Sequence, residues 1–185
     1  MSNGTLPLKA TQVLDDCQRA VGCLENVPHE DKQLFRIYWT FCLLALRNVE
    51  EVILKYDAQQ YPTIKSLWTK RRAELDALKQ QYNEQTSYDA CESDDYLVYH
   101  RFIHGEQNDA YFYDAIPSYV DEMWVMVDQE HAVNWENTYL PMVDTEKWGC
   151  DDCREWVQRG INWWRKEIAK LLERVVSNNP QKGQK

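Results

Sequence analysis

The stretch from Leu34 to Tyr56 is the feature that most constrains how this chain can fold. Wound as an α-helix at about 100° per residue, it has polar side chains in only one narrow stripe. That stripe consists of Arg36, Thr40, Arg47 and Glu51. A helix that is apolar in nearly every other direction must be covered on most sides by other elements. The sequence therefore predicts an all-α or mainly α fold, a helical bundle around a central apolar helix at residues 34–56.

Other segments with the apolar spacing of amphipathic helices complete the predicted bundle. Three of them are long, at residues 9–24, 64–82 and 151–176. A shorter helix is expected from Asp95 to His104, because Ser93 and Asp94 can cap its start and Gly105 can end it. With 185 residues the chain fits one domain, taken as residues 1–176. The polar tail at 177–185 is expected to be disordered.

The region from residue 106 to 148 is predicted to be an irregular or small β-hairpin insertion. Residues 119–127 are rich in β-branched and aromatic residues, as in one arm of a hairpin that turns at 128–131. However, Pro117 followed by Asp121 and Glu122 is also typical of a helix start. The choice between helix and hairpin for 119–134 stays open, with a slight preference for helix or irregular structure.

The cellular compartment is inferred from what the N-terminal residues and the longest apolar run look like. The first residues lack the basic and apolar regions of a signal peptide. The longest unbroken apolar run, Phe41 to Leu46, is far shorter than the ~20 residues that cross a bilayer. We therefore expect a cytoplasmic protein without membrane association, whose six cysteines are reduced thiols. Cys17 and Cys42 lie at apolar helical positions and are predicted to be core residues.

Charge is distributed very unevenly along the chain. Residues 84–152 contain seventeen acids and two bases, a net charge of −15. Because the whole chain carries −9, the rest of the chain carries +6. The phosphates of a nucleic acid would be repelled by residues 84–152, so direct nucleic-acid binding through this segment is disfavoured.

The acidic segment also contains many aromatic residues. Carboxylates that steer an encounter, combined with aromatic anchors that are buried on contact, are typical of a surface that binds a basic protein partner. The candidate contact residues are Asp94, Asp95, Asp121, Glu122, Trp124 and Trp135. The alternative is a solvated acidic face with the aromatic rings inside, since solubility alone accounts for much of such a charge pattern.

Cys150 and Cys153 form a CxxC pair at the start of the last predicted helix. Such a pair can be redox-active or can supply half of a zinc site. The two aspartates between the cysteines disfavour a thiolate, and no second pair of this kind completes four ligands. No nucleotide-binding or calcium-binding motif is present either. The prediction is that these cysteines are structural and that the protein has no metal and no cofactor.

Arg101 and His104 are the candidate catalytic pair. A histidine can act as general base or acid, while an arginine stabilises charge that develops on a phosphate. The order of the predicted helices, with ALRNVEEVI at the end of the long apolar helix and Arg101-Phe-Ile-His104-Gly-Glu later in the chain, resembles the HEPN family of helical bundles.

The resemblance to HEPN proteins implies a dimerising helical bundle, and in some members a metal-independent ribonuclease. Members that cleave RNA have a longer spacer between arginine and histidine than the two residues found here. We therefore expect first a non-enzymatic interaction module of the accessory, immunity or inhibitor type. The alternative is a HEPN-type ribonuclease that uses Arg101 and His104.

Overall fold

The structure, a computed structural model, describes residues 8–84, 93, 95–104, 115–120, 122–128 and 152–177. These residues form, in chain order, α1 (Lys9–Glu25), α2 (Lys32–Val52), the π-helical turn η1 (Ile53–Asp57), α3 (Ala58–Gln60), α4 (Pro62–Glu84), the π-helix η3 (Asp95–Ile103), β1 (Ala115–Val120), β2 (Met123–Asp128) and α7 (Cys153–Ser177). The fold is mainly α-helical, as the sequence predicts.

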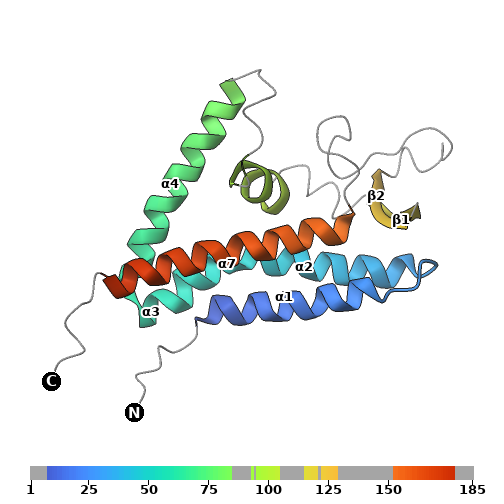
Figure 1. Cartoon of the computed structure of the whole chain (residues 1–185), viewed down its shortest axis with the longest axis horizontal. Coiled ribbons are helices and arrows are strands. Elements are labelled where there is room, and N and C mark those ends of the chain that lie inside the picture. Colours follow the sequence, from blue (N-terminus) through green and yellow to red (C-terminus); the bar gives the residue numbers. More distant parts are fainter. Residues whose placement is uncertain are drawn as a thin grey trace, which may run out of the picture.

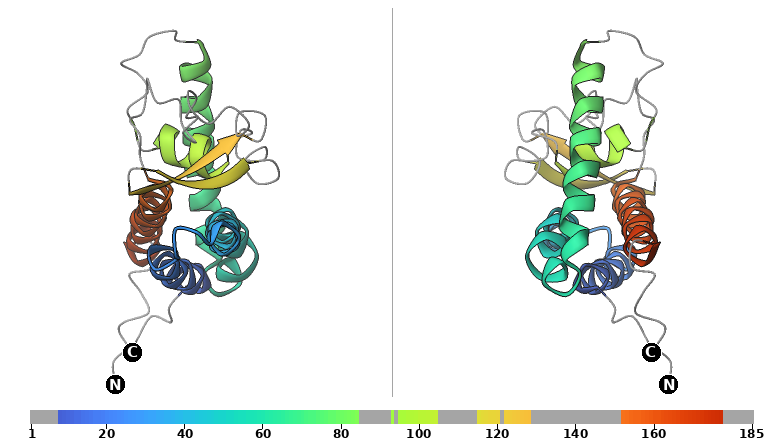
Figure 2. Two further views of the ribbon diagram at one scale, coloured as in Figure 1. Left: turned by 90° about the vertical axis from the view of Figure 1, so that its right-hand side faces the viewer. Right: turned by 90° about the vertical axis from the view of Figure 1, so that its left-hand side faces the viewer.

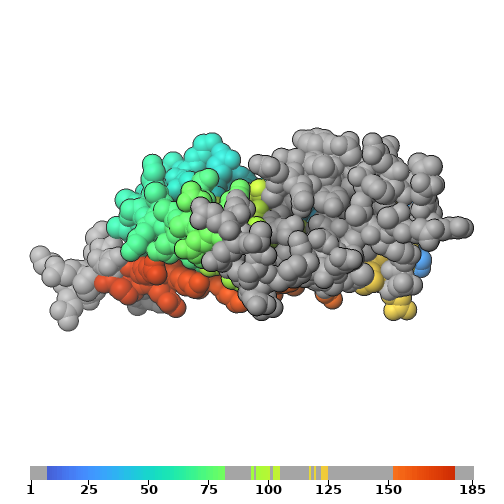
Figure 3. Space-filling model, turned by 90° about the horizontal axis from the view of Figure 1, so that it is seen from above, coloured from blue at the N-terminus to red at the C-terminus, as the bar shows by residue number. Residues whose placement is uncertain are grey.

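The long helices α1, α2 and α7 lie side by side and form the base of the molecule (Figure 1). Helix α4 leaves this base at a steep angle, and η3 lies between α4 and the hairpin formed by β1 and β2 (Figure 1). Viewed along the base helices, η3 and the hairpin cover one side of this layer (Figure 2). Seen from above, α4 borders α7 (Figure 3). None of the helices in the described part of the chain is long and apolar enough to cross a membrane.

The core fills the space between the base helices and the elements above them. Its largest fully buried side chains include four tryptophans, Trp39, Trp68, Trp124 and Trp164. Rings of this size each bury about 150–250 Å², so they contribute much of the hydrophobic stabilisation. The indole of Trp164 on α7 also donates to the carbonyl of Leu46 on α2, at 2.9 Å. The apolar face of α2 is therefore joined to α7 both by packing and by a buried hydrogen bond.

Helix α1 obtains its N-terminal cap from a residue far away in the sequence. The residue at its N-cap position, Leu8, makes no side-chain capping hydrogen bond. The carboxylate of Asp57 accepts hydrogen bonds from the backbone N–H groups of Lys9 and Ala10, at 2.7 and 3.1 Å. Asp57 is the last residue of η1 and is almost completely buried. A carboxylate suits this position because the first N–H groups of a helix lack partners within the helix.

The predicted helix at 9–24 corresponds to α1, the one at 64–82 to α4 and the one at 151–176 to α7. The central helix at 34–56 is present as α2 followed by η1. Cys17 and Cys42 are fully buried between α1 and α2, which confirms their assignment to the core. Ser177 still belongs to α7, and the remaining residues of the predicted tail lie outside the described part of the chain.

The expectation that the central helix is covered on most sides is not confirmed. Three of its large apolar side chains are about half exposed: Ile37 (56%), Phe41 (47%) and Leu44 (55%). They stand four and three residues apart, so they form one line along the helix, which we call the α2 stripe. Helix α2 buries its opposite face against α1, α7 and the hairpin. Helix α2 therefore forms part of the surface of the helical layer and is not enclosed by other helices.

The small β-hairpin predicted within 106–148 is present, because β1 and β2 pair antiparallel. The slight preference for helix or irregular structure at 119–134 was therefore wrong for its described part. The turn also differs from the hairpin alternative, which placed it at 128–131. It lies between Val120 and Met123, and Glu122 within it has a φ of 66°. Trp124 on β2 points into the core, where its ring stacks on Phe35 with centroids 4.0 Å apart.

Candidate functional site at the end of helix α2

A buried glutamate organises a group of polar side chains near the end of α2. Glu50 is only 7% exposed. Its carboxylate accepts a hydrogen bond from Arg72 Nη1 on α4 at 2.5 Å and one from the hydroxyl of Tyr99 on η3 at 3.0 Å. His104, directly after η3, places its Nε2 3.8 Å from the same carboxylate. One carboxylate thus joins α2, α4 and η3.

The local structure explains why these residues meet. Helical spacing places Arg47, Glu50 and Leu54 on the same side of α2 and η1. The Nε of Arg47 donates to the carbonyl of Ile103 at 2.8 Å, which satisfies one of the last carbonyls of η3. This bond fixes the end of η3 against α2. It also holds the following residue, His104, close to Glu50.

The environment shifts the protonation of the aromatic members of this group. Burial lowers the pKa of His104 to about 4, although Glu50 acts in the opposite direction. Burial, reinforced by Glu50, raises the pKa of the Tyr99 hydroxyl above its ordinary value. The carboxylate of Glu50 raises the pKa of Arg72, against the effect of burial. At neutral pH the group therefore contains a neutral histidine, a neutral tyrosine and a charged arginine–glutamate pair.

A surface pocket of about 360 Å³ opens beside this group. It is lined by Arg47, Glu50, Glu51, Leu54, Lys55 and Arg72. Leu54 and Lys55 belong to η1, where the π-helical turn interrupts the regular continuation of α2. Turns of this kind occur frequently at functional sites. The pocket is therefore the candidate functional site, with three cationic side chains and a buried carboxylate at its edge.

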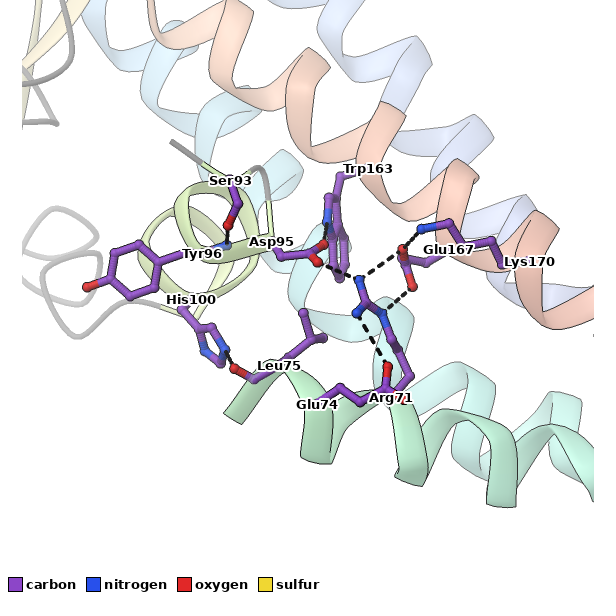
Figure 4. A network of polar contacts seen from close by, with 10 residues as sticks. All are labelled: Arg71, Glu74, Leu75, Ser93, Asp95, Tyr96, His100, Trp163, Glu167 and Lys170. Carbon is purple, nitrogen blue, oxygen red and sulfur yellow. Dashed lines mark hydrogen bonds and ion pairs between the residues drawn. The ribbon is translucent and has the colours of Figure 1, made fainter. Parts of the chain in front are cut away.

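A second polar network ties α4, η3 and α7 together (Figure 4). The guanidinium of Arg71 donates to Asp95 and to Glu167, at 2.8 Å in each case. Asp95 also accepts a bond from the indole of Trp163 at 2.9 Å, and Glu167 one from Lys170 at 2.6 Å. Burial opposes the charged form of Asp95, but Arg71 and Trp163 outweigh it and lower its pKa. Because its members satisfy one another, this network is a structural clamp.

The structure places the predicted contact residues in different environments. Asp95 is engaged in the Arg71 clamp, and Trp124 is 1% exposed, so neither offers a free surface to a partner. For Trp124 the alternative interpretation, with the aromatic rings inside, fits the structure, whereas Asp95 is paired with Arg71 and is not part of a solvated acidic face. Glu122 is exposed at the turn of the hairpin. Asp94, Asp121 and Trp135 lie outside the described residues.

The structure describes the side chains of only some of the candidate catalytic and metal-binding residues. His104 lies at the candidate site, whereas the side chain of Arg101 is outside the described part of the chain. Cys153 is a buried cysteine at the start of α7, and Cys150 is not among the described residues. Within the described ranges, no group of three or more His, Cys, Asp or Glu side chains could hold a metal ion.

Sequence reasoning did not find Glu50, Arg72 or Tyr99. Glu50 is one of two adjacent glutamates near the end of α2, and its neighbour Glu51 is an ordinary exposed residue paired with Lys55. Arg72 is on the side of its helix that the apolar spacing assigns to solvent. A signal was present in the buried face of α2, because Val49 and Val52 on either side of Glu50 are core residues. A glutamate at such a position requires a partner.

Comparison with family models, with curated proteins and with solved structures finds no match to this chain. What the chain does must therefore be inferred from its own geometry.

Proposed function

We propose that this protein is a non-enzymatic interaction module that works by binding other proteins. The observation that supports this function is the α2 stripe. Soluble monomers expose single apolar residues routinely, but contiguous apolar surface on a regular element more often marks a contact site. Ile37, Phe41 and Leu44 stand in line on a long helix, each about half exposed. A partner that covers them would stabilise both surfaces.

The partner proposed for the α2 stripe is a second copy of the chain. In an antiparallel pair of α2 helices centred on Phe41, Ile37 of one copy meets Leu44 of the other. The interface is then self-complementary, as a two-fold dimer requires. Covering the exposed half of each side chain contributes on the order of 1 kcal/mol. The six side chains of two copies thus supply roughly 6 kcal/mol, against an association cost of about 4 kcal/mol or more. The surplus is about 2 kcal/mol or less, so we expect a weak dimer that is populated only at high protein concentration.

Sedimentation velocity over a range of protein concentrations tests this dimer. The average mass of the wild-type protein should rise with concentration, while Phe41→Glu should remain monomeric because it buries a charge at the centre of the interface. Val176→Glu is the matched control, since Val176 is 64% exposed on α7 and lies outside the α2 stripe. A wild-type protein that stays monomeric, or a Phe41→Glu variant that still associates, would contradict the proposal.

The proposed hetero-partner is a cytoplasmic protein with a basic surface, bound by the acidic residues of 84–152. Support comes from the net charge of −15 in this segment and from the exposed position of Glu122. Two other described acids of the segment do not contribute, because Asp95 pairs with Arg71 and Asp152 with Arg154. The contact is therefore assigned to Glu122 and to the acids outside the described residues.

Charge reversal tests the acidic contact. Any partner captured from the native host should be released by moderate salt, because exposed charges are screened within about 10 Å at 0.1 M. Its capture should also fail with Asp94→Lys, Asp121→Lys and Glu122→Lys combined. Glu173→Lys on the exposed side of α7 is the control and should leave capture unchanged. Binding that ignores both salt and the triple reversal would exclude this contact.

A second candidate function, a metal-independent ribonuclease of the HEPN type, is supported by one observation. His104 lies beside the candidate site, where Arg47 and Arg72 both act on its pKa and could hold a phosphate. Against it stands the lowered pKa of His104, which makes the side chain a weak base at neutral pH. The test is cleavage of single-stranded RNA by the purified protein. Activity that His104→Ala abolishes would favour this function, and activity that survives the substitution would remove it.

A further inference from the structure

The pocket at the end of α2 has more cations than carboxylates. Among the residues that the structure describes, Arg47, Lys55 and Arg72 converge on it from α2, η1 and α4, while Glu50 and Glu51 supply two carboxylates. The side chains of Lys55 and Arg72 are 63% and 53% exposed, so a dissolved ligand can reach them.

Each of the three cations is also held in place by an acceptor of the protein. Arg72 donates to Glu50 at 2.5 Å, Lys55 donates to Glu51 at 2.8 Å, and Arg47 donates to a backbone carbonyl at 2.8 Å. Arg72 also lies 3.9 Å from Asp76 on its own helix. A guanidinium has five N–H donors and an ammonium has three, so Arg72 and Lys55 can still donate to a ligand. The cations are thereby positioned in advance, which lowers the entropic cost of binding an anion.

The buried position of Glu50 strengthens this arrangement. Its carboxylate is fixed by the Tyr99 hydroxyl as well as by Arg72, so the arginine is anchored to the core and not to a mobile surface group. A group of this kind binds best to an anion with several strong acceptors. A phosphate monoester carries about −1.5 to −2 charges at pH 7 and three acceptor oxygens, and it matches the donor geometry of arginine.

We propose that this pocket binds the phosphate group of a small phosphorylated molecule. Its volume of about 360 Å³ exceeds that of a phosphate alone and is in the lower range of small-molecule sites. The remaining space accommodates a small organic body that packs on Leu54, an aliphatic side chain of the lining. The residues that line the pocket belong neither to the α2 stripe nor to the segment 84–152. Tyr99 and Ile103 of that segment only hold Glu50 and Arg47 in position.

Isothermal titration calorimetry of the full-length protein at low salt tests the site. The probes are inorganic phosphate and glucose 6-phosphate, with glucose as the uncharged control. We expect both phosphates to bind and glucose 6-phosphate to bind more tightly, while glucose gives no signal. Lys55→Ala should weaken binding by about tenfold, because it removes one charged donor from an exposed position. Arg72→Lys should do the same, since lysine keeps the charge beside Glu50 and loses the forked donor.

Arg19→Ala is the matched control, because Arg19 is an exposed arginine on α1 that pairs with Asp16 in the same helix. It should bind the phosphates like the wild type. The proposal is overturned if neither phosphate binds, or if Arg19→Ala weakens binding as much as Lys55→Ala does. It is also overturned if a single-stranded RNA oligonucleotide binds while neither small phosphate does, a result that would favour the ribonuclease. Lys55→Ala removes only a surface pair, so its result can be interpreted even if Arg72→Lys folds poorly.

Discussion

Replacing Asp57 with alanine should destabilise the protein far more than its place in a short π-helical turn suggests. The carboxylate is 1% exposed and is the cap of α1, with its two oxygens bound to the N–H groups of Lys9 and Ala10. Alanine leaves both N–H groups without these acceptors. The N–H group of Ala10 is in a buried bond, so water cannot easily replace the carboxylate there.

The magnitude follows from the two lost bonds. Loss of a helix N-cap costs about 0.5–2 kcal/mol, and a buried donor left without a partner costs about 1–3 kcal/mol. The two estimates overlap in part, so we expect the free energy of unfolding to fall by about 2–4 kcal/mol. In a chain of this size, each kcal/mol lowers Tm by about 2–4 °C. Asp57→Asn retains one acceptor oxygen and should lose roughly half as much.

Urea denaturation followed by circular dichroism measures this effect. The control is Asp16→Ala, which removes a 60% exposed carboxylate from an ion pair within α1. It should change the free energy of unfolding by less than about 0.5 kcal/mol. If Asp57→Ala and Asp16→Ala are equally stable, the cap contributes little, and the explanation of how α1 is attached to the end of α2 is wrong.

Three further expectations concern other parts of the fold. Gly160→Ala should lower the free energy of unfolding by about 1–3 kcal/mol, because the new Cβ would lie 2.8 Å from Leu46 Cδ1. In a double-mutant cycle, Leu46→Ala should reduce this loss, and additive effects would contradict the explanation. Glu122→Gly should raise the free energy of unfolding by about 0.5–1 kcal/mol and thereby raise Tm slightly, because glycine adopts the φ of 66° without strain. An unchanged or lower Tm would argue against strain at this turn. Burial lowers the pKa of His104 in the folded state to about 4, from an ordinary value of 6.5. The unfolded chain therefore binds more protons between these values, and stability should fall as pH drops from 6.5 towards 4. In the His104→Gln variant, Tm should fall less over this pH range. Part of the fall should remain, because burial also lowers the pKa of His100. A pH profile identical to that of the wild type would refute the role of His104.

The candidate site was only partly accessible from the sequence. His104 could be singled out because histidine is rare in this chain and stands near an arginine. Glu50 and Arg72 could not, since charged residues on helices are normally solvated and twenty-one positions separate the two. Their pairing depends on the angle at which α4 leaves the base and on the position of η3 beside it. This angle and this position depend on how distant segments of the chain pack together, which the spacing of residues within one helix does not determine.

The uneven distribution of charge along the chain likewise predicted only part of the structure. The count of acids in residues 84–152 is a property of the sequence, but whether a given carboxylate faces a partner depends on what packs beside it. Asp95 and Asp152 have arginine partners, one on α4 and one on α7. Trp124 is a core residue because the hairpin turns it towards Phe35. Composition alone does not distinguish these residues from the exposed Glu122.

By itself, the sequence determined the helical character of this protein and the approximate limits of its long helices. These follow from local spacing, because side chains three and four residues apart share one face of a helix. Only the tertiary structure decided that Asp57 caps α1, that Glu50 gathers Arg72 and Tyr99, and that one side of α2 remains exposed. Each of these depends on contacts between residues distant in the chain, and such contacts are set by how the helices pack together and not by the pattern within any one of them.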